Sequence, residues 1–442
     1  MADGIVFERV GVQAASIVTD AFVQSSDAMA RLQGAPGYRY AMIPHPVSNL
    51  SPEECHERAA AVLPQVLEIL GLDQTEAAPG QVGSTEDDGD QASVLEPADL
   101  PTDRVEDVYR LARYYQERGW TDGLPVLPVT EAVVDEFCAY VGRDPREEVV
   151  STAALERVCT VRLAAAAAAM AGCRKEYFPI VLAAAEAMQP SVSTGLLQST
   201  TGQSQLLIVN GPIRGQLGFN GAGNVFGPGF QANASVGRAI RLIVMNAFGI
   251  RPRAFDQATQ GTPAKYSFCI AENEEDSPWE PLHVERGFAA ESNVVTIHFA
   301  RSTLHIENRS SNKGEEVLLT IADSMSYAGS YMAGRGYTVV MGPEHAALLA
   351  RQGWSKSDAK RFLWEHWGRR AGDLRRMGLL PQAAQGKEGP ADDELLRFGQ
   401  SPDSILLVVA GAGNAGISTV IPTVAPMFHS KQIDPPARSA GR

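Results

Sequence analysis

Two kinds of apolar pattern alternate along most of this 442-residue chain. One is a short, continuous apolar run bounded by polar or glycine residues, which is typical of a buried strand. Runs of this kind occupy residues 205–210, 337–341 and 404–410. The other pattern repeats apolar side chains at helical spacing, and it covers residues 103–118, 130–141, 152–172, 175–188, 314–334, 343–351 and 355–369. The alternation predicts an α/β fold.

Further strands are predicted between these segments. One carries Cys269 and ends just before an acidic cluster at residues 272–276. Residues 293–300 and 302–307 alternate in the manner of two strands of a hairpin or of a sheet edge. No internal repeat is evident in the sequence. We therefore expect a main domain over residues 103–430, of mixed α/β or α+β class, with glycine-rich loops.

The first 74 residues predict only two strands, 14–19 and 38–43, together with two helices. The second helix is expected to begin after Ser51, which forms a capping box with Glu54. Two strands and two helices bury too little surface for an independent core. Residues 1–74 are therefore expected to be an incomplete, parallel α/β half-domain. Its other half would come from elsewhere in the chain or from a partner.

The segment from 75 to 102 predicts a flexible linker. Between residues 76 and 99 there are seven acidic residues and no lysine or arginine, interspersed with Pro, Gly, Ser and Gln. A segment of this composition has too little apolar surface to offset the entropy lost on ordering. A mobile tail is expected at residues 431–442.

The stretch from Asn210 to Arg238 joins a predicted strand to a predicted helix and is rich in glycine. Glycine lets the backbone approach a ligand closely, and a helix start offers free N–H groups that suit anions. The loop either forms the wall of a pocket for a small polar or anionic group, or it is a tightly packed crossover in which the glycines only avoid steric clashes. Asn233 or Ser235 is expected to cap the helix. The candidate binding residues are Asn210, Arg214, Asn220, Gly221, Gly223 and Asn224.

A second glycine loop follows the strand at 404–410. Residues 411–416 match the pattern G-x-G-x-x-G, but too few residues follow for a dinucleotide-binding βαβ unit. We interpret this loop as a second close-approach segment that could face the same pocket. Its candidate binding residues are Gly411, Gly413 and Asn414.

Charge and composition exclude several classes of protein. The net charge of −14, from 38 basic and 52 acidic residues, opposes sequence-independent nucleic-acid binding and anionic membranes. The longest apolar stretch is too short to span a bilayer, and the N-terminus lacks the features of a signal peptide. Five scattered cysteines fit a reducing cytoplasm. No short histidine pair or C-x-x-C spacing predicts a metal site, and no cofactor is predicted.

Three residues after the glycine loop are candidates for catalysis. Cys269 could be a reactive thiolate if His283 or Arg286 supplied a nearby cation; the alternative is a buried strand cysteine. Glu272 could be a general acid or base, or it could belong to a solvated loop. His283 could act as an acid or base or bind the substrate; otherwise it is a structural histidine.

Other candidates lie in loops. Asp122 could reach the pocket or only form an Asx-turn. Arg214 could clamp an anion. His45, held between two prolines, would be presented at a strand end, where α/β sheets bind ligands.

Several motifs resemble a known family. IVTDAF (17–22), IPHP (43–46) and NLSPEE (49–54) resemble the C-terminal half of the UGSC family of selenoproteins and their cysteine homologues, which is similar to the selenoprotein subunit of glycine and proline reductases. The main domain resembles a large domain that occurs with UGSC proteins. The matching segments are GWTDGLPV (119–126), MAGCRKEYFPIVLAA (170–184), LIVNGPIR (207–214), FGPGFQANASVGRA (226–239), KYSFCIAENEEDSPWEPLHVERG (265–287) and GWSKSDAKRFLW (353–364).

The resemblance also implies a partner. In the family, a U/C-Gly-Ser-Cys motif lies upstream of the matching segments, and this sequence lacks it. The resemblance thus implies a separate small polypeptide that carries the motif, with Thr19, Asp20 and His45 beside its thiol. The expected function is the large subunit of a heteromeric thiol- or selenol-dependent enzyme that cleaves, forms or reduces a carbon–heteroatom bond, such as carbon–sulfur, in a small polar substrate. The alternatives are a non-catalytic ligand-binding or stabilising subunit, and a lyase or hydrolase without thiol chemistry.

Overall fold

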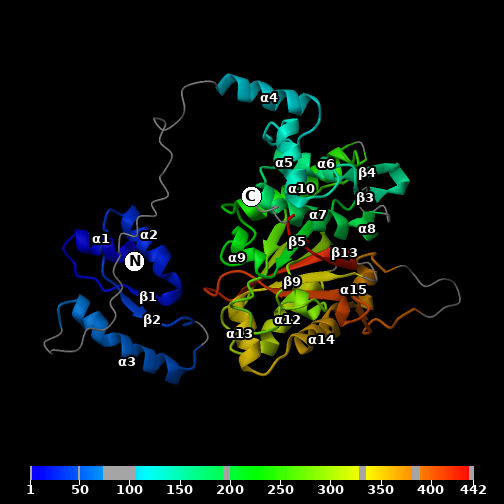
Figure 1. Cartoon of the computed structure of the whole chain (residues 1–442). Helices are drawn as coiled ribbons and strands as arrows, with labels where there is room; N and C mark the ends of the chain where they lie inside the picture. The colour runs from blue at the N-terminus through cyan, green and yellow to red at the C-terminus, as the bar shows by residue number, and fades with distance from the viewer. Residues whose placement is uncertain are drawn as a thin grey trace. The chain divides into compact units, whose positions relative to one another are not determined.

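The computed structural model describes residues 2–47, 50–72, 105–192, 197, 200–253, 255–327, 335–380 and 389–437 (Figure 1). The chain divides near residue 102 into two compact units, which are taken in turn below. The predicted acidic linker at 75–102 lies outside the described residues.

The N-terminal unit is a small parallel α/β structure, as its sequence predicts. Its elements are α1 (Ala2–Arg9), β1 (Ile17–Thr19), α2 (Val23–Leu32), β2 (Ala41–Ile43) and α3 (Pro52–Ile69). The strands β1 and β2 pair in parallel. The capping box at the start of α3 is confirmed, because Ser51 and Glu54 exchange side-chain to backbone hydrogen bonds. Only α1 was not expected.

The hydrophobic core of this unit is small. Its buried cluster consists of Ile5, Val18, Ala30, Tyr38 and Tyr40. Many large apolar side chains of the same unit stay exposed: Val6, Phe7, Val10, Val12, Ile17, Phe22, Met29, Val47, Leu63 and Leu72. A two-stranded sheet with so little buried surface is marginal on its own, which agrees with an incomplete half-domain.

The large unit is built on one mixed sheet with the order β12-β9-β13-β7-β5-β6, and β8 pairs with β13. The strands are β5 (Ser204–Asn210), β6 (Cys269–Ala271), β7 (Val294–Ala300), β8 (Leu304–Glu307), β9 (Tyr337–Met341), β12 (Ile405–Val409) and β13 (Ile417–Gln432). β5 is parallel to β6 and β9 is parallel to β12, whereas β7 and β13 run antiparallel to their neighbours. The three continuous apolar runs are thus confirmed as strands.

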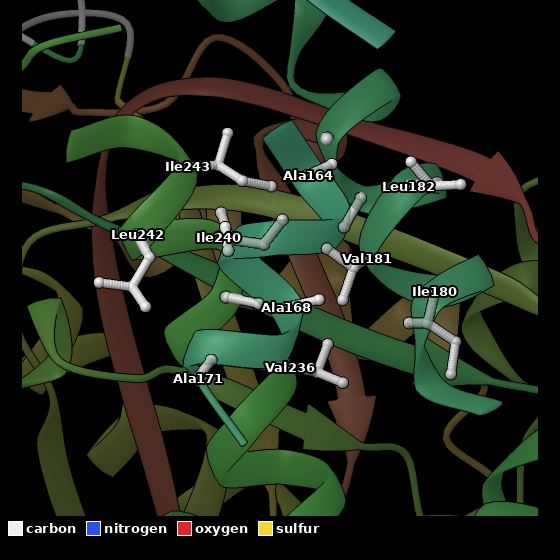
Figure 2. Packing of buried hydrophobic residues seen from close by; sticks show 14 of the residues in the cluster. Ala164, Ala168, Ala171, Ile180, Val181, Leu182, Val236, Ile240, Leu242 and Ile243 are labelled. Atoms are coloured by element: carbon white, nitrogen blue, oxygen red, sulfur yellow. The ribbon is translucent and has the colours of Figure 1, made fainter. Parts of the chain in front are cut away.

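Helices cover this sheet on two sides (Figure 1). On one side lie α5 (Glu131–Val141), α6 (Val161–Met170), α7 (Phe178–Ala187) and α10 (Gln231–Asn246), and α4 (Val105–Glu117) precedes them. On the other side lie α12 (Gly314–Met325), α13 (Pro343–Arg351) and α14 (Lys356–His366). Figure 2 shows Ala164 and Ala168 of α6 facing Ile240 of α10. The small alanine side chains allow this close helix–helix approach.

Successive side chains of a strand point to opposite faces, and here they enter different clusters. Leu207 and Val209 of β5 pack under the helices on the first side. Leu206 and Ile208 of the same strand share a second cluster with Leu406 of β12. The two halves of the sheet therefore face each other across an inner apolar layer. A backbone hydrogen bond also joins the two halves, because Asn273 N–H donates to the carbonyl of Val409 at 2.8 Å.

The two halves repeat one topology, although no sequence repeat was evident. Each half has two parallel strands joined through helices, followed by an antiparallel strand: β5, β6 and β7 in the first, β9, β12 and β13 in the second. A Gly-Pro pair follows both β5 and β9 and leads into a short helix, α9 (Ile213–Leu217) or α13. β7 and β13 pair at the centre.

Several expectations about the large unit differ from the structure. The helix expected over 314–334 ends at Met325, and the one expected over 355–369 ends at His366, because Gly368–Arg370 forms the strand β10. The helix expected from residue 152 begins instead at Val161, because 148–160 forms the hairpin of β3 (Glu148–Thr152) and β4 (Arg157–Thr160). β7 and β8 do not pair with each other; both pair with β13. The expected tail boundary at residue 430 falls inside β13, and beyond it Ile433 N–H donates to the carbonyl of Asn293.

Candidate functional site

Several predicted site residues meet where β5 and β6 end. Asn210 is the last residue of β5, and Glu272 directly follows β6. Because parallel strands end at the same edge of a sheet, their side chains come together there. Asn210 Nδ2 donates to Glu272 Oε2 at 2.6 Å and to Glu274 Oε1 at 3.0 Å. We name Asn210, Glu272, Glu274 and His283 the strand-end cluster.

Glu272 is a fully buried carboxyl group. Its Oε2 also accepts a hydrogen bond from Leu282 N–H at 2.7 Å. Its Oε1 has no hydrogen-bond partner among the described residues. Burial raises the pKa of Glu272, and the charge of Lys356 and the hydrogen bonds from Leu282 and Asn210 offset this only in part. Burial therefore shifts this carboxyl group toward its neutral form relative to an exposed glutamate.

His283 lies in α11 (Leu282–Glu285), and its ring is fully buried. Its Nε2 is 3.1 Å from the carbonyl of Ala290. A carbonyl only accepts, so Nε2 carries the proton in the neutral ring and Nδ1 is left as the acceptor. Nδ1 has no hydrogen-bond partner among the described residues, and it lies 3.9 Å from Glu274 Oε1. In this tautomer the lone pair of Nδ1 is available to accept a proton.

Arg214 reaches the same cluster from α9, but its donors are already used. The guanidinium bonds the carbonyls of Gly211 and Glu272 and the carboxylates of Glu274 and Glu275, at 2.8–3.1 Å. The expected anion clamp is thus occupied by the protein's own acidic groups. Arg214 holds the acidic cluster in place in this structure.

Cys269 does not meet the conditions expected for a reactive thiolate. Its side chain is buried in β6, and burial, with the neighbouring Cys173, raises the pKa of its thiol. Among the described residues the two expected cations make other contacts: His283 Nε2 lies 3.1 Å from the carbonyl of Ala290, and the Arg286 guanidinium lies 4.6 Å from the centre of the Phe428 ring. The geometry favours the alternative, a buried strand cysteine.

The glycine-rich loop packs tightly against the strand ends. A Cβ on Gly221 would lie 2.8 Å from the carbonyl oxygen of Ala271, so only glycine fits there. Gly411 N–H donates to the carbonyl of Gly221 at 2.8 Å, which joins the two glycine loops. A Cβ on Gly223 would contact Ala412, and Asn224 has φ of 59°. Gly413 and Asn414 lie in the turn between β12 and β13.

Asn233 was expected to cap a helix, and its role is different. α10 begins at Gln231, so Asn233 lies inside its first turn and Ser235 lies further along. Asn233 accepts a hydrogen bond from Asn220 N–H and donates to the carbonyls of Asn220 and Cys269. This side chain ties the loop to α10 and β6. Sequence spacing could not reveal it, because its partners lie in other elements.

Asp122 forms the expected Asx-turn, and it also forms an ion pair that the sequence analysis did not predict. Its carboxylate accepts from Leu124 N–H at 3.2 Å, in an Asx-turn arrangement. It also makes a two-pronged ion pair with Arg238 of α10, at 2.8 and 2.9 Å. The pair fixes the loop after α4 to α10.

The N-terminal unit brings its own predicted residues together. Thr19 ends β1, and Asp20 follows it; His45 follows β2. His45 N–H donates to Asp20 Oδ1 at 2.8 Å, and Thr19 Oγ1 is 3.2 Å from His45 Nδ1. The ring of Phe22 contacts the His45 ring edge-on. A polar group thus lies where both parallel strands end.

Comparison with known proteins identifies the N-terminal region only. Residues 1–72 match the model of the UGSC family. No curated protein and no solved structure matches the chain. Within the part of the chain that the structure describes, no helix is long and apolar enough to cross a membrane, and no group of His, Cys, Asp or Glu is arranged to hold a metal ion.

Proposed function

Because residues 1–72 form a UGSC-type domain, we propose that this chain is the large subunit of a heteromeric thiol- or selenol-dependent enzyme. The reactive cysteine or selenocysteine would come from a small partner polypeptide with a C/U-Gly-Ser-Cys motif. The substrate would be a small polar organic molecule. The reaction would cleave, form or reduce a carbon–heteroatom bond, of which carbon–sulfur is one.

The observation that carries this proposal is the polar group of Thr19, Asp20 and His45 where β1 and β2 end. Ligands of parallel α/β sheets bind beyond the carboxyl ends of the strands. An imidazole beside a thiol stabilises the thiolate, which is the nucleophile. His45 is held by Asp20 through its backbone, so its ring is presented at a defined place.

The surface of the N-terminal unit supports a protein partner. Among the described residues no further strand pairs with the outer edge of β1, and Ile17 at the start of β1 is 53% exposed. The outer edge of β2 is covered in part, because the Gln65 side chain of α3 bonds the backbone N–H and carbonyl of Met42. Adding a strand to an open edge satisfies backbone groups and buries apolar side chains. A partner segment that pairs with this sheet would enlarge the small cluster of Ile5, Val18, Ala30, Tyr38 and Tyr40.

The strand-end cluster would supply acid–base groups to the main unit. Burial raises the pKa of Glu272 above that of an exposed glutamate, which makes it better suited to act as a proton donor. His283 Nδ1 has no hydrogen-bond partner among the described residues and could accept one. A donor and an acceptor held in one buried site are suited to general acid–base chemistry. The free thiols of all five cysteines also support a reducing compartment such as the cytoplasm.

A second candidate is a non-catalytic subunit that binds a ligand and stabilises the partner. Two observations favour it. Arg214 is fully engaged by protein groups, and Cys269 is a buried thiol. Under this alternative the strand-end cluster is a structural network that holds β5 and β6 together.

The test is co-expression of the full chain with a small polypeptide that carries the C-Gly-Ser-Cys motif. We expect the two to co-elute in size-exclusion chromatography. We also expect Ile17→Glu to abolish co-elution, because a charge at the open edge opposes strand addition. Leu163→Glu is the matched control, since Leu163 is a similarly exposed apolar residue of the large unit, and it should leave co-elution unchanged.

The same complex separates the two candidates. An enzyme subunit should lower the pKa of the partner's thiol, so iodoacetamide should alkylate it at pH 6.5 about tenfold faster in the complex than alone. Co-elution with an unchanged alkylation rate would favour the non-catalytic subunit. Absence of co-elution would reject the partner proposal. Co-elution that Ile17→Glu does not weaken would reject strand addition at the edge of β1.

A further inference from the structure

The large unit contains a cavity of about 830 Å³ that none of the preceding roles uses. It lies between the loop after α4, the middle of α10 and the loops that follow α10. Four basic residues line it: Arg241, Arg251, Arg253 and Lys265. We propose that this cavity binds a small organic anion through its carboxylate or phosphate group.

The buried wall of the cavity is an ion-paired triad. Arg241 of α10 is 6% exposed, and its Nη2 bonds Asp256 Oδ2 at 2.9 Å. Lys265 Nζ bonds both oxygens of Asp256 at 2.7 and 2.8 Å. One carboxylate thus serves two cations. The triad retains one net positive charge in a largely buried place, where a charge attracts an anion more strongly than in water.

Two further arginines complete the basic wall. No carboxylate partner is recorded for Arg251 or Arg253 among the described residues, and Arg251 Nε is buried without a hydrogen-bond partner. The approach of Arg251 to Gly119 is close, since a Cβ there would lie 3.2 Å from Nη1. Arg253 has φ of 67°, a conformation that is rare for a residue with a side chain. Its backbone N–H is held by the carbonyl of Asp256.

Acidic groups do not neutralise this wall. Asp122 also lines the cavity, but its carboxylate is committed to Arg238. Asp256 is then the carboxylate of the lining that remains to balance the charges of four basic residues, Arg241, Arg251, Arg253 and Lys265. The excess is notable in a chain with a net charge of −14. A concave site with one sign of charge concentrates ligands of the opposite sign.

The lining also defines the class of ligand. The planar fork of arginine matches carboxylate and phosphate groups, which it binds through two parallel hydrogen bonds. Met245 and the half-exposed ring of Tyr266 offer apolar surface beside the charges. A cavity of this volume is in the range that holds a small molecule. The fitting ligand is thus a small organic acid or phosphate ester.

This inference does not rest on thiol chemistry, because the cavity and the strand-end cluster share no residue. Failure of one proposal therefore leaves the other standing.

The test is isothermal titration of the full chain with succinate, glycerol phosphate and inorganic phosphate, each at low salt. We expect succinate or glycerol phosphate to bind, and the tighter of the two identifies the anionic group. Arg251→Gln and Arg253→Gln should each weaken this binding roughly tenfold or more, since each removes a charge-assisted contact. These arginines have no recorded ion pair, so the variants should fold, and circular dichroism spectra would check this.

Arg146→Gln is the matched control, because Arg146 is an exposed arginine whose side chain is 92% accessible. It should leave the affinity unchanged. Three outcomes overturn the proposal. The first is that neither organic anion binds with a dissociation constant below 10 mM, which corresponds to about 2.7 kcal/mol of binding free energy. The second is binding that both cavity variants leave unchanged, and the third is binding no tighter than that of inorganic phosphate, which would indicate nonspecific ion attraction.

Discussion

The pKa values of two glutamates near one another in sequence, the buried Glu272 and the partly buried Glu285, are shifted in opposite directions. Burial raises the pKa of Glu272, because the attraction of Lys356 and its hydrogen bonds do not offset the loss of water. Burial acts in the same direction on Glu285, but the ammonium groups of Lys356 and Lys360 outweigh it and hold that pKa below its usual range. The fully buried Glu272 loses more hydration, and the partly exposed Glu285 has ion pairs with two lysines, so both factors separate the two pKa values.

Glu272 should make the protein less stable as pH rises. A folded-state pKa above the unfolded value means that the folded chain binds the proton more tightly. The contribution of Glu272 to stability is fully present below the ordinary carboxyl pKa of 4.5 and is lost as pH rises through the raised value. Glu272→Gln keeps the neutral shape, so the variant should gain stability relative to the wild type between pH 5 and pH 8. Urea unfolding at both pH values measures this.

Glu285→Gln is the control of opposite sign. The lowered pKa of Glu285 stabilises the fold above the unfolded pKa and is lost as pH falls through the folded value. The variant should therefore lose about 1–3 kcal/mol of unfolding free energy at pH 7, discounted for partial exposure, and less near pH 4. Equal pH trends in both variants would contradict this assignment of charge states.

At the scale of elements, the contact between α10 and β6 depends on one glycine. A Cβ on Gly237 would lie 2.8 Å from Phe268 N and 3.2 Å from Cys269 Cβ. These atoms belong to the buried start of β6 and to the backbone just before it, so they cannot move aside as the end of a flexible side chain would. Together with the Asn233 side chain, which bonds the carbonyl of Cys269, this close approach sets the distance between helix and sheet.

Gly237→Ala should lower the free energy of unfolding by about 1–3 kcal/mol, because α10 must shift away from β6. Gly215→Ala is the matched control: Gly215 lies in α9, and a Cβ there meets no atom within 4 Å. Alanine favours the helix over glycine, so the control should be neutral or stabilising by about 0.5–1 kcal/mol. Urea unfolding compares them, and equal effects would show that the contact with β6 is not tight.

At the scale of the whole molecule, the two units differ in how much they bury. The large unit has extensive apolar clusters on both sides of its sheet and between the sheet halves. The N-terminal unit has one cluster of five buried residues, Ile5, Val18, Ala30, Tyr38 and Tyr40. Stability grows with buried apolar surface. The large unit is therefore expected to fold without the N-terminal unit.

A chain of residues 103–442 should melt cooperatively, within a few degrees of the full-length protein. A chain of residues 1–72 should show no cooperative transition and should bind a hydrophobic dye, because its apolar surface is exposed. Circular dichroism melting and dye fluorescence measure both. A cooperative, monomeric 1–72 fragment would contradict the incomplete half-domain and weaken the case for a partner.

The sequence by itself determined the local features of this protein. The capping box of Ser51 and Glu54 forms between residues three apart. The strands β5, β9 and β12 follow from continuous apolar runs. Hydrogen bonds and periodicities within a few residues depend little on the rest of the chain, so pattern was sufficient there.

Only the tertiary structure decided what each side chain faces. The partners of Arg214 lie about sixty residues away in sequence, and the repeated topology of the two sheet halves is invisible in residue patterns. The sequence around Cys269 fits either a reactive or a buried cysteine. Only the packing of the folded chain shows that the thiol is buried and that its pKa is raised. The basic cavity joins Arg241, Arg251 and Lys265 from separate segments. Burial and charge pairing depend on elements that meet only after folding, and no local pattern encodes them.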